Sequence, residues 1–239
     1  RDHPLSLLTM ELDDPTGYGR ILRDPGGNII GVIEHHEARP EQHEIREVNT
    51  GIIMADAERL RDWLGRIDCN NAKQEYYLPD VFPFARAEFG EINGVLAPDS
   101  ADLQGANDRV QLAALERRYQ QRMAAHLMAD GVQLLDPERI DIRGSVTAGK
   151  DVVIDVNVVL EGAISLGDRV SIGAGSVLKD CRLAAGTRVE SHSVLEGVET
   201  TGPCTIGPFA RLRPGTVLSS GCKVGNFVEA KNATLGEGS

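Results

Sequence analysis

The chain has 239 residues and a formal net charge of −11, from 36 acidic and 25 basic side chains. This acidic balance argues against nucleic acid as a partner, because phosphate backbones are bound by basic surfaces. No apolar run reaches the roughly 20 residues of a membrane-spanning helix, and the four scattered cysteines without a CxxC pair indicate free thiols in the cytoplasm.

The first 106 residues alternate strand-like and helix-like stretches, which predicts α/β layering with too few elements for a complete doubly wound domain. The predicted strands are residues 5–12, 29–34, 48–54 and 92–97. The predicted helices are residues 55–67 and 79–89.

Residues 107–131 form a predicted linker that consists of one long helix and its cap. Asn107 and Asp108 supply an N-cap, and Gly131 is a natural C′ residue. An apolar stripe is predicted to pack against a neighbour and contains Leu112, Leu115, Tyr119, Met123 and Leu127. The opposite face is predicted to be solvated and carries Arg117, Arg118, Gln121 and Arg122.

From residue 132 onward an aliphatic side chain returns at every sixth position, a period that fits neither a helix nor a plain strand. The three successive registers are Val146, Val152, Val158, Ile164 and Val170, then Val177, Leu183 and Val189, then Ile206, Leu212, Leu218, Val224 and Ala230. Hexapeptide repeats of this kind predict a parallel β-helix with a narrow aliphatic core. A glycine follows the aliphatic residue at five predicted corners, namely Gly167, Gly173, Gly207, Gly225 and Gly236.

Three short segments of the first region carry candidate binding chemistry. Residues 13–20 form a turn in which Gly17 and Gly19 let backbone approach a ligand. Glu34 ends a strand, and Asn49 lies near the start of another, where each can hydrogen-bond a sugar. Each signal alone is weak, since most such features are only turns or solvated strand ends.

Five blocks, in this order, resemble a bacterial family, the bifunctional N-acetylglucosamine-1-phosphate uridyltransferase/glucosamine-1-phosphate acetyltransferases. They are DDPTGYGRI (13–21), EVNTG (47–51), NAKQEYY (71–77), TIGPFARLRPG (205–215) and VGNFVEAK (224–231). The resemblance implies that residues 1–106 are the C-terminal portion of a Rossmann-like uridyltransferase domain. It implies a linker helix over 107–131, and over 132–239 the N-terminal portion of a left-handed β-helix acetyltransferase domain.

The resemblance also implies residue roles, cofactors and partners. Gly19, Glu34 and Asn49 would bind the nucleotide sugar, and Asn107 would bind substrate and be a Mg²⁺ ligand. The family's uridyl transfer is attack of a sugar 1-phosphate on the α-phosphorus of UTP, with release of pyrophosphate. In the β-helix, Arg213 and Lys231 would grip the phosphate of glucosamine 1-phosphate, which acetyl-CoA would acetylate. A homotrimer is implied as well.

The chain departs from the family pattern at both active sites. It contains neither the Gly-rich nucleotide loop nor the Asp that would share Mg²⁺ with Asn107. The family's catalytic His is expected beyond Ser239, so no catalytic residue is assigned here. His192 occupies an earlier turn and is predicted to be structural or exposed. We therefore expect an internal portion of a longer protein that is inactive by itself.

The sequence leaves two other functions open. One is a different sugar-1-phosphate nucleotidyltransferase whose β-helix is only structural, although the cations Arg213 and Lys231 speak against it. The other is a non-catalytic module that trimerises and binds sugar phosphates.

Overall fold

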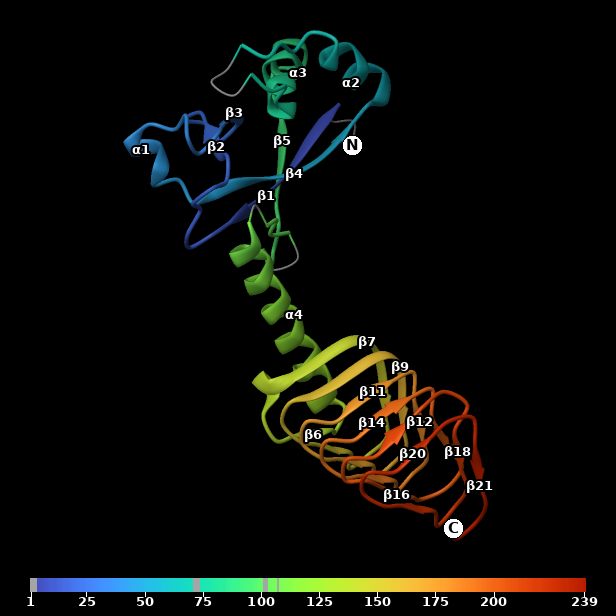
Figure 1. The fold of residues 1–239 in the computed structure, drawn as a ribbon. Helices are drawn as coiled ribbons and strands as arrows, with labels where there is room; N and C mark the ends of the chain where they lie inside the picture. Colours follow the sequence, from blue (N-terminus) through green and yellow to red (C-terminus); the bar gives the residue numbers. More distant parts are fainter. Residues whose placement is uncertain (1–3, 71–73, 101–102, 107) are drawn as a thin grey trace. The chain divides into compact units, whose positions relative to one another are not determined.

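The computed structural model describes residues 4–70, 74–100, 103–106 and 108–239. The chain divides into two compact units, unit 1 (Arg1–Leu112) and unit 2 (Ala113–Ser239), and each is described by itself (Figure 1). Among the described residues, no helix is both long and apolar enough to span a bilayer.

Unit 1 is built on a five-stranded sheet in the order β3-β2-β4-β1-β5. All neighbouring strands are antiparallel except β1 and β5, which pair in parallel. The strands are β1 (Leu5–Glu11), β2 (Arg20–Arg23), β3 (Ile29–Ile33), β4 (Glu47–Ala55) and β5 (Asn93–Leu96).

The helices of unit 1 are α1 (Pro40–His43), α2 (Ala57–Leu64) and α3 (Val81–Phe89), with a 3₁₀ turn at Leu78–Asp80. α1 buries no residue, whereas α2 and α3 contribute to the core. Trp63 of α2 and Phe82 of α3 are buried in one cluster with Leu5 and Leu7 of β1. The mixed α/β prediction is therefore confirmed. Neither β2 nor α1 was expected from the sequence, because four residues give no measurable periodicity.

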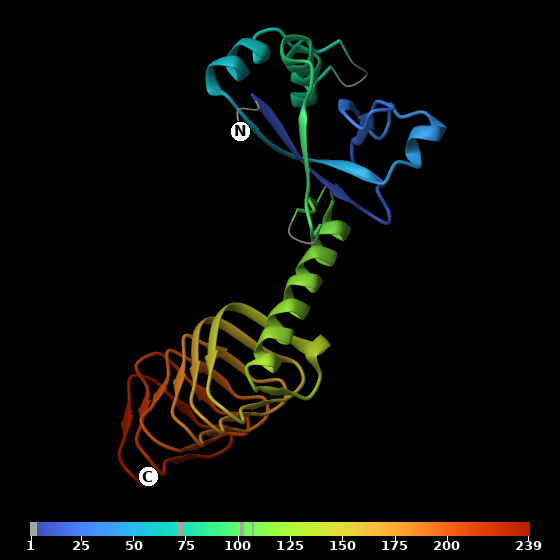
Figure 2. The same cartoon turned by 180° about the vertical axis from the view of Figure 1, so that it is seen from behind.

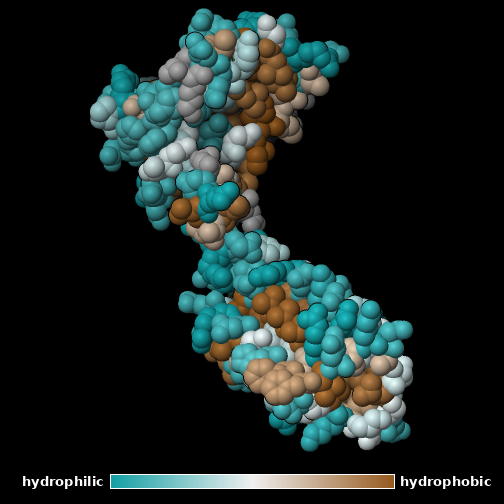
Figure 3. All heavy atoms as spheres, viewed as in Figure 1, coloured by the Kyte–Doolittle hydropathy of each residue, from teal (hydrophilic) through white to brown (hydrophobic). Residues whose placement is uncertain are grey.

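Other apolar side chains of this sheet remain uncovered. Figure 3 shows a brown band on unit 1, and the exposed apolar side chains of β4 and β5 include Ile52, Met54, Val95 and Leu96. The register places Met54 opposite Ser6, so Met54 shares a face with Ser6 and not with the buried Leu5 and Leu7.

The predicted long helix is present as α4 (Arg109–Ala129). Asp108 Oδ1 accepts the backbone N–H of Gln111 at 2.8 Å, and Gly131 has a left-handed φ of 98°, so both caps are as expected. The predicted stripe is only partly correct, because Leu112 and Tyr119 are exposed. The buried side chains of α4 are Gln120, Ala124 and Leu127.

Unit 2 is a parallel β-solenoid, which Figure 2 shows from behind. The six strands of one of its sheets correspond to about six turns. One six-stranded sheet contains β6 (Gln133–Leu134), β8 (Val153–Ile154), β10 (Ser171–Ile172), β13 (Arg188–Val189), β16 (Thr205–Ile206) and β19 (Lys223–Val224). In its register Val153 pairs with Ser171, Ser171 with Arg188, Arg188 with Thr205, and Thr205 with Lys223. From β8 onward each turn of this sheet therefore takes 17 or 18 residues, which is about three hexapeptides.

The remaining strands join in a second sheet that begins with two long strands, β7 (Ile140–Ala148) and β9 (Val158–Leu166). The short ones are β11 (Val177–Lys179), β12 (Arg182–Leu183), β14 (Val194–Glu196), β15 (Glu199–Thr200), β17 (Arg211–Leu212), β18 (Val217–Leu218), β20 (Glu229–Ala230) and β21 (Thr234–Leu235). A 3₁₀ turn (Pro137–Arg139) precedes β7. The parallel β-helix prediction is thus confirmed.

The repeat registers match the solenoid interior with one exception. Aliphatic side chains of all three registers lie in the core, but Leu178 is fully buried where Val177 was predicted to point inward. The next aliphatic side chain of the core is Leu183, five positions later instead of six, with the buried Cys181 between them. A 17-residue turn loses one residue at this point, so the six-residue count places the inward position one residue too early.

The corner glycines are confirmed where another turn lies above them. A Cβ on Gly167 would meet the backbone N of Ala185 at 2.5 Å, and one on Gly173 would meet that of Ser191 at 2.6 Å. Gly225 would meet nothing within 4 Å. The cysteine prediction also holds, since all four thiols are free and Cys181, Cys204 and Cys222 are buried.

Candidate functional sites

In unit 1 the structure brings Gly19, Glu34 and Asn49 together where strands β2, β3 and β4 meet. Arg20 pairs with Ile33 on one side and with Val48 on the other, so the three residues flank these register positions. Asn49 donates its backbone N–H to the carbonyl of Gly19 at 2.9 Å.

Packing explains why position 19 is a glycine. A Cβ at Gly19 would lie 2.8 Å from Cγ1 of Val32 and 3.3 Å from Oε1 of Glu34. Space and not backbone torsion excludes a side chain here, because Gly19 is absent from the residues with positive φ. The Glu34 carboxylate therefore lies directly against the Gly19 backbone.

The side chain of Asn49 is oriented by its own turn. Its Oδ1 accepts the backbone N–H of Gly51 at 2.9 Å, which leaves the amide NH₂ as the group that can donate to a ligand. Together, Asn49 and Glu34 offer a hydrogen-bond donor and an acceptor, a combination suited to sugar hydroxyls.

Tyr77 adds a residue to which the sequence assigned no role, although it lies within the NAKQEYY block. Its hydroxyl is buried and has no hydrogen-bond partner among the described residues. Burial raises the pKa of Tyr77, and the carboxylates of Glu37, Glu75 and Glu34 raise it further. A neutral hydroxyl near Glu34 is one more potential ligand contact.

Next to Tyr77 lies a cavity of about 310 Å³. Its lining residues are Glu37, Arg66, Ile67, Asp68, Asn70, Tyr77, Asp80 and Phe84. Burial, with the nearby charges of Asp68 and Glu37, raises the pKa of Asp80.

Asn107, the predicted substrate and Mg²⁺ ligand, lies outside the described residues. Within the part of the chain that is described, no group of three His, Cys, Asp or Glu side chains is placed to hold a metal ion. The described residues alone therefore do not fit a Mg²⁺ site.

In unit 2, Arg213 and Lys231 lie in neighbouring turns of the solenoid. Leu212 pairs with Ala230, and the backbone N–H of Arg213 donates to the carbonyl of Ala230 at 2.9 Å, so Lys231 follows directly across the turn. The two predicted phosphate ligands thus share one face.

Glu229, a carboxylate not predicted from the sequence to have a role, completes this cluster. Glu229 Oε1 lies 3.2 Å from Nη1 of Arg213 and 3.9 Å from Nε of Arg211. Lys231 is exposed and forms no ion pair with a described residue. The pairing of Arg213 with Glu229 aligns the guanidinium along the face and leaves Lys231 available to an anion.

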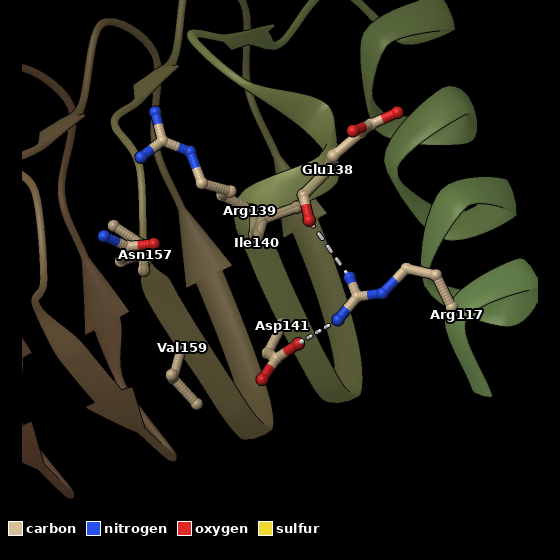
Figure 4. Close-up of a pocket in the computed structure, with 8 residues that line it drawn as sticks. Arg117, Glu138, Arg139, Ile140, Asp141, Asn157 and Val159 are labelled. Carbon is tan, nitrogen blue, oxygen red and sulfur yellow. Dashed lines mark hydrogen bonds and ion pairs between the residues drawn. The ribbon is translucent and has the colours of Figure 1, made fainter. Parts of the chain in front are cut away.

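A further cavity, of about 280 Å³, lies between α4 and the first solenoid turn (Figure 4). Arg117 donates through Nη1 to the carbonyl of Glu138 at 3.1 Å, and its Nη2 lies 3.6 Å from Asp141. Asp141 also pairs with Arg143, and Arg139 pairs with Asp136. Arg117 is therefore not simply solvated as predicted. Its bonds fasten the helix to the solenoid, and none of the predicted site residues lines this cavity.

His192 is exposed, which is one of the two outcomes predicted from the sequence. Its ring stacks on Phe209 with centroids 5.2 Å apart, and Phe209 stacks on Phe227 at 5.4 Å. The three residues share a left-handed backbone conformation at one corner of successive turns. His192 is thus part of an aromatic ladder on the solenoid surface.

Comparison with known proteins gives strong matches along the whole chain. It is 53% identical over 238 residues to a protein of Alkalilimnicola ehrlichii named "Bifunctional protein GlmU", a match that covers 100% of this chain and 51% of that protein. Proteins of the same name from Stenotrophomonas maltophilia and Stutzerimonas stutzeri are each 52% identical, over 235 and 234 residues. Each of these two matches covers 98% of this chain and 52% of the relative. The chain therefore spans about half the length of the curated relatives it matches. No family model matches it.

Proposed function

The chain belongs with the bifunctional GlmU proteins as a partial homologue, and on this premise we propose that it supplies sugar-phosphate-binding parts of an enzyme that makes UDP-N-acetylglucosamine. Acetyl-CoA acetylates glucosamine 1-phosphate, and the product then reacts with UTP to give the UDP-sugar and pyrophosphate. The observation that carries this proposal is the identity over the full chain, which includes both candidate sites.

For uridyl transfer, Gly19, Glu34 and Asn49 are the proposed sugar ligands. The close approach of Glu34 to the Gly19 backbone supports this, since both can contact one small ligand. Their part is to orient the sugar phosphate, and transfer to a phosphate depends largely on such positioning.

Asn107 is proposed as a substrate ligand and as one oxygen ligand of Mg²⁺, a hard cation that neutralises phosphate charge when bound. No step is assigned to the metal, because the described residues do not make up its site.

For acetyl transfer, Arg213 and Lys231 are the proposed ligands of the glucosamine 1-phosphate phosphate group. The guanidinium fork suits a phosphate, and the adjacent ammonium adds a point charge. Glu229 supports Arg213 by holding its Nη1 at 3.2 Å. Fixing the phosphate positions the amino group that receives the acetyl group.

We also propose a homotrimer assembled through the β-helix. Since UTP, acetyl-CoA and sugar phosphates are cytoplasmic metabolites, we also propose a cytoplasmic location. The domain limits proposed from the sequence remain 1–106, 107–131 and 132–239.

Arg213→Ala is expected to weaken glucosamine 1-phosphate binding roughly 10-fold, because a charge-assisted hydrogen bond contributes about 1.5–3 kcal/mol. The measurement is isothermal titration of the 239-residue chain with glucosamine 1-phosphate. UDP-N-acetylglucosamine binding should be unchanged, since Glu34 and Asn49 lie in the other unit.

Arg188→Ala is the matched control, because Arg188 is an exposed solenoid arginine 3.8 Å from a glutamate, Glu190. It should leave both affinities as in the wild type. Equal losses from the two substitutions, or no glucosamine 1-phosphate binding by the wild type, would contradict the acetyl-site assignment.

A further inference from the structure

Arg20, at the start of β2, is a buried cation without a carboxylate partner among the described residues. The residue is 1% exposed, and its Nε has no hydrogen-bond partner in the described part of the chain. Its Nη1 donates to the carbonyl of Tyr18, and its Nη2 lies 3.3 Å from Nδ1 of His35. Burial lowers the pKa of Arg20, which the charge of Asp14 partly offsets.

The contact with Arg20 fixes the protonation state of His35. A guanidinium only donates, so Nδ1 must accept with its lone pair and the single ring proton must be on Nε2. Burial is the main cause that lowers the pKa of His35, followed by the charges of Arg20, His43 and His36, while Asp14 opposes them. His43, on α1, packs its ring edge-on at 4.9 Å.

This hydrogen bond joins the two segments that carry candidate sugar ligands. Gly19 immediately precedes Arg20, and Glu34 immediately precedes His35. Through Tyr18 and His35, one guanidinium spans the turn before β2 and the end of β3. A Cβ on Gly19 would lie 3.3 Å from Glu34 Oε1. The two segments must therefore keep a fixed position relative to each other.

We propose that Arg20 and neutral His35 are positioning residues of the UDP-sugar site, which hold the Tyr18–Gly19 turn against Glu34, and that protonation of His35 releases this turn. The proposal rests on the proposed uridyl-transfer function. Protonated His35 has no lone pair for Arg20 and places a second cation beside a buried one.

The direction of the pH effect follows from the lowered pKa. The unfolded chain binds a proton at His35 near its ordinary value of 6.5, and the folded chain only at lower pH. The contribution of neutral His35 to the free energy of unfolding is complete above pH 6.5. It falls as the pH drops below this value towards the lower pKa of His35 in the folded chain. UDP-sugar affinity should decline over the same interval.

The test compares His35→Asn with the wild type from about pH 8 to about pH 5, a range that spans histidine titration. The Asn side-chain oxygen can accept from Arg20 but does not titrate. The wild type should lose UDP-N-acetylglucosamine affinity roughly 10-fold on acidification, equivalent to about 1.4 kcal/mol. His35→Asn should keep its affinity.

His43→Asn, which removes a neighbouring imidazole that has no bond to Arg20, should retain the wild-type decline. The same decline in His35→Asn would overturn the proposal.

Two further readouts separate this proposal from the proposed function. If the wild type binds no UDP-sugar, the pH dependence of the unfolding free energy of unit 1 tests the proposal instead. Loss of this pH dependence in His35→Asn would support the hydrogen bond between Arg20 and neutral His35. If His35→Asn does not fold, ¹⁵N NMR of the wild-type histidines decides. An unprotonated Nδ1 at about pH 7.5 is expected for His35, and a proton on that nitrogen would overturn the proposal.

Discussion

Gly19→Ala should weaken UDP-N-acetylglucosamine binding roughly 100-fold. The new methyl group would lie 2.8 Å from Cγ1 of Val32, a branched side chain that cannot rotate away freely, and 3.3 Å from Glu34 Oε1. Relieving both contacts moves Glu34 away from the Gly19 backbone. Two ligand hydrogen bonds, one to a charged group, contribute about 2–4 kcal/mol. Isothermal titration at neutral pH measures the loss.

Gly31→Ala provides the matched control in the same β2–β3 hairpin. A Cβ at Gly31 would meet nothing within 4 Å, and Gly31 has no positive φ. Its unfolding free energy and its UDP-sugar affinity should stay close to those of the wild type. If Gly19→Ala bound UDP-sugar as well as Gly31→Ala does, the sugar site would not lie against Gly19.

The solenoid could be predicted from sequence because its periodicity is enforced by a repeated contact. Every turn must place aliphatic side chains in the same narrow interior, and over a hundred residues few other folds produce that pattern. The error at Val177 has a local cause, since dropping one residue from a turn shifts the register without changing the composition. Such shifts become visible only when strand pairing fixes Leu178 opposite Leu160.

The candidate sites were predictable only as separate segments. Gly19 and Asn49 lie in the family blocks and Glu34 lies at the end of a predicted strand, but their convergence depends on the antiparallel pairing of β2 with β3 and β4. Tyr77 and Glu229 stand inside the quoted blocks, yet no spacing rule reveals that one hydroxyl is buried without a partner or that one carboxylate holds Arg213. These properties arise from contacts between elements distant in sequence.

The buried face of α4 was harder to predict from the sequence, because one of its buried residues is polar. Apolar spacing favoured Leu112 and Tyr119, whereas the structure buries Gln120. Its Oε1 accepts the backbone N–H of Ile142 at 2.7 Å, and its Nε2 donates to the carbonyl of Ile142 at 2.9 Å. β7 pairs with β9 on its other side, so Gln120 takes the place of a missing neighbouring strand.

Gln120→Met is therefore expected to lower the unfolding free energy of unit 2 by about 2–4 kcal/mol. Methionine nearly preserves the volume, but it leaves the N–H and C=O of Ile142, a residue 1% exposed, without partners. Each unsatisfied buried group costs about 1–3 kcal/mol. Urea unfolding followed by circular dichroism measures the change.

Gln121→Met, at the adjacent exposed position, controls for the substitution itself and should change the unfolding free energy by less than about 0.5 kcal/mol. Hydrogen exchange localises the effect. The amide of Ile142 should lose protection in Gln120→Met. The amide of Leu195, which lies three turns further along the same ladder, should lose less protection. The reason is that a solenoid transmits stability chiefly between neighbouring turns. Equal stability of the two variants would mean that water satisfies Ile142 and that Gln120 does not cap the solenoid edge.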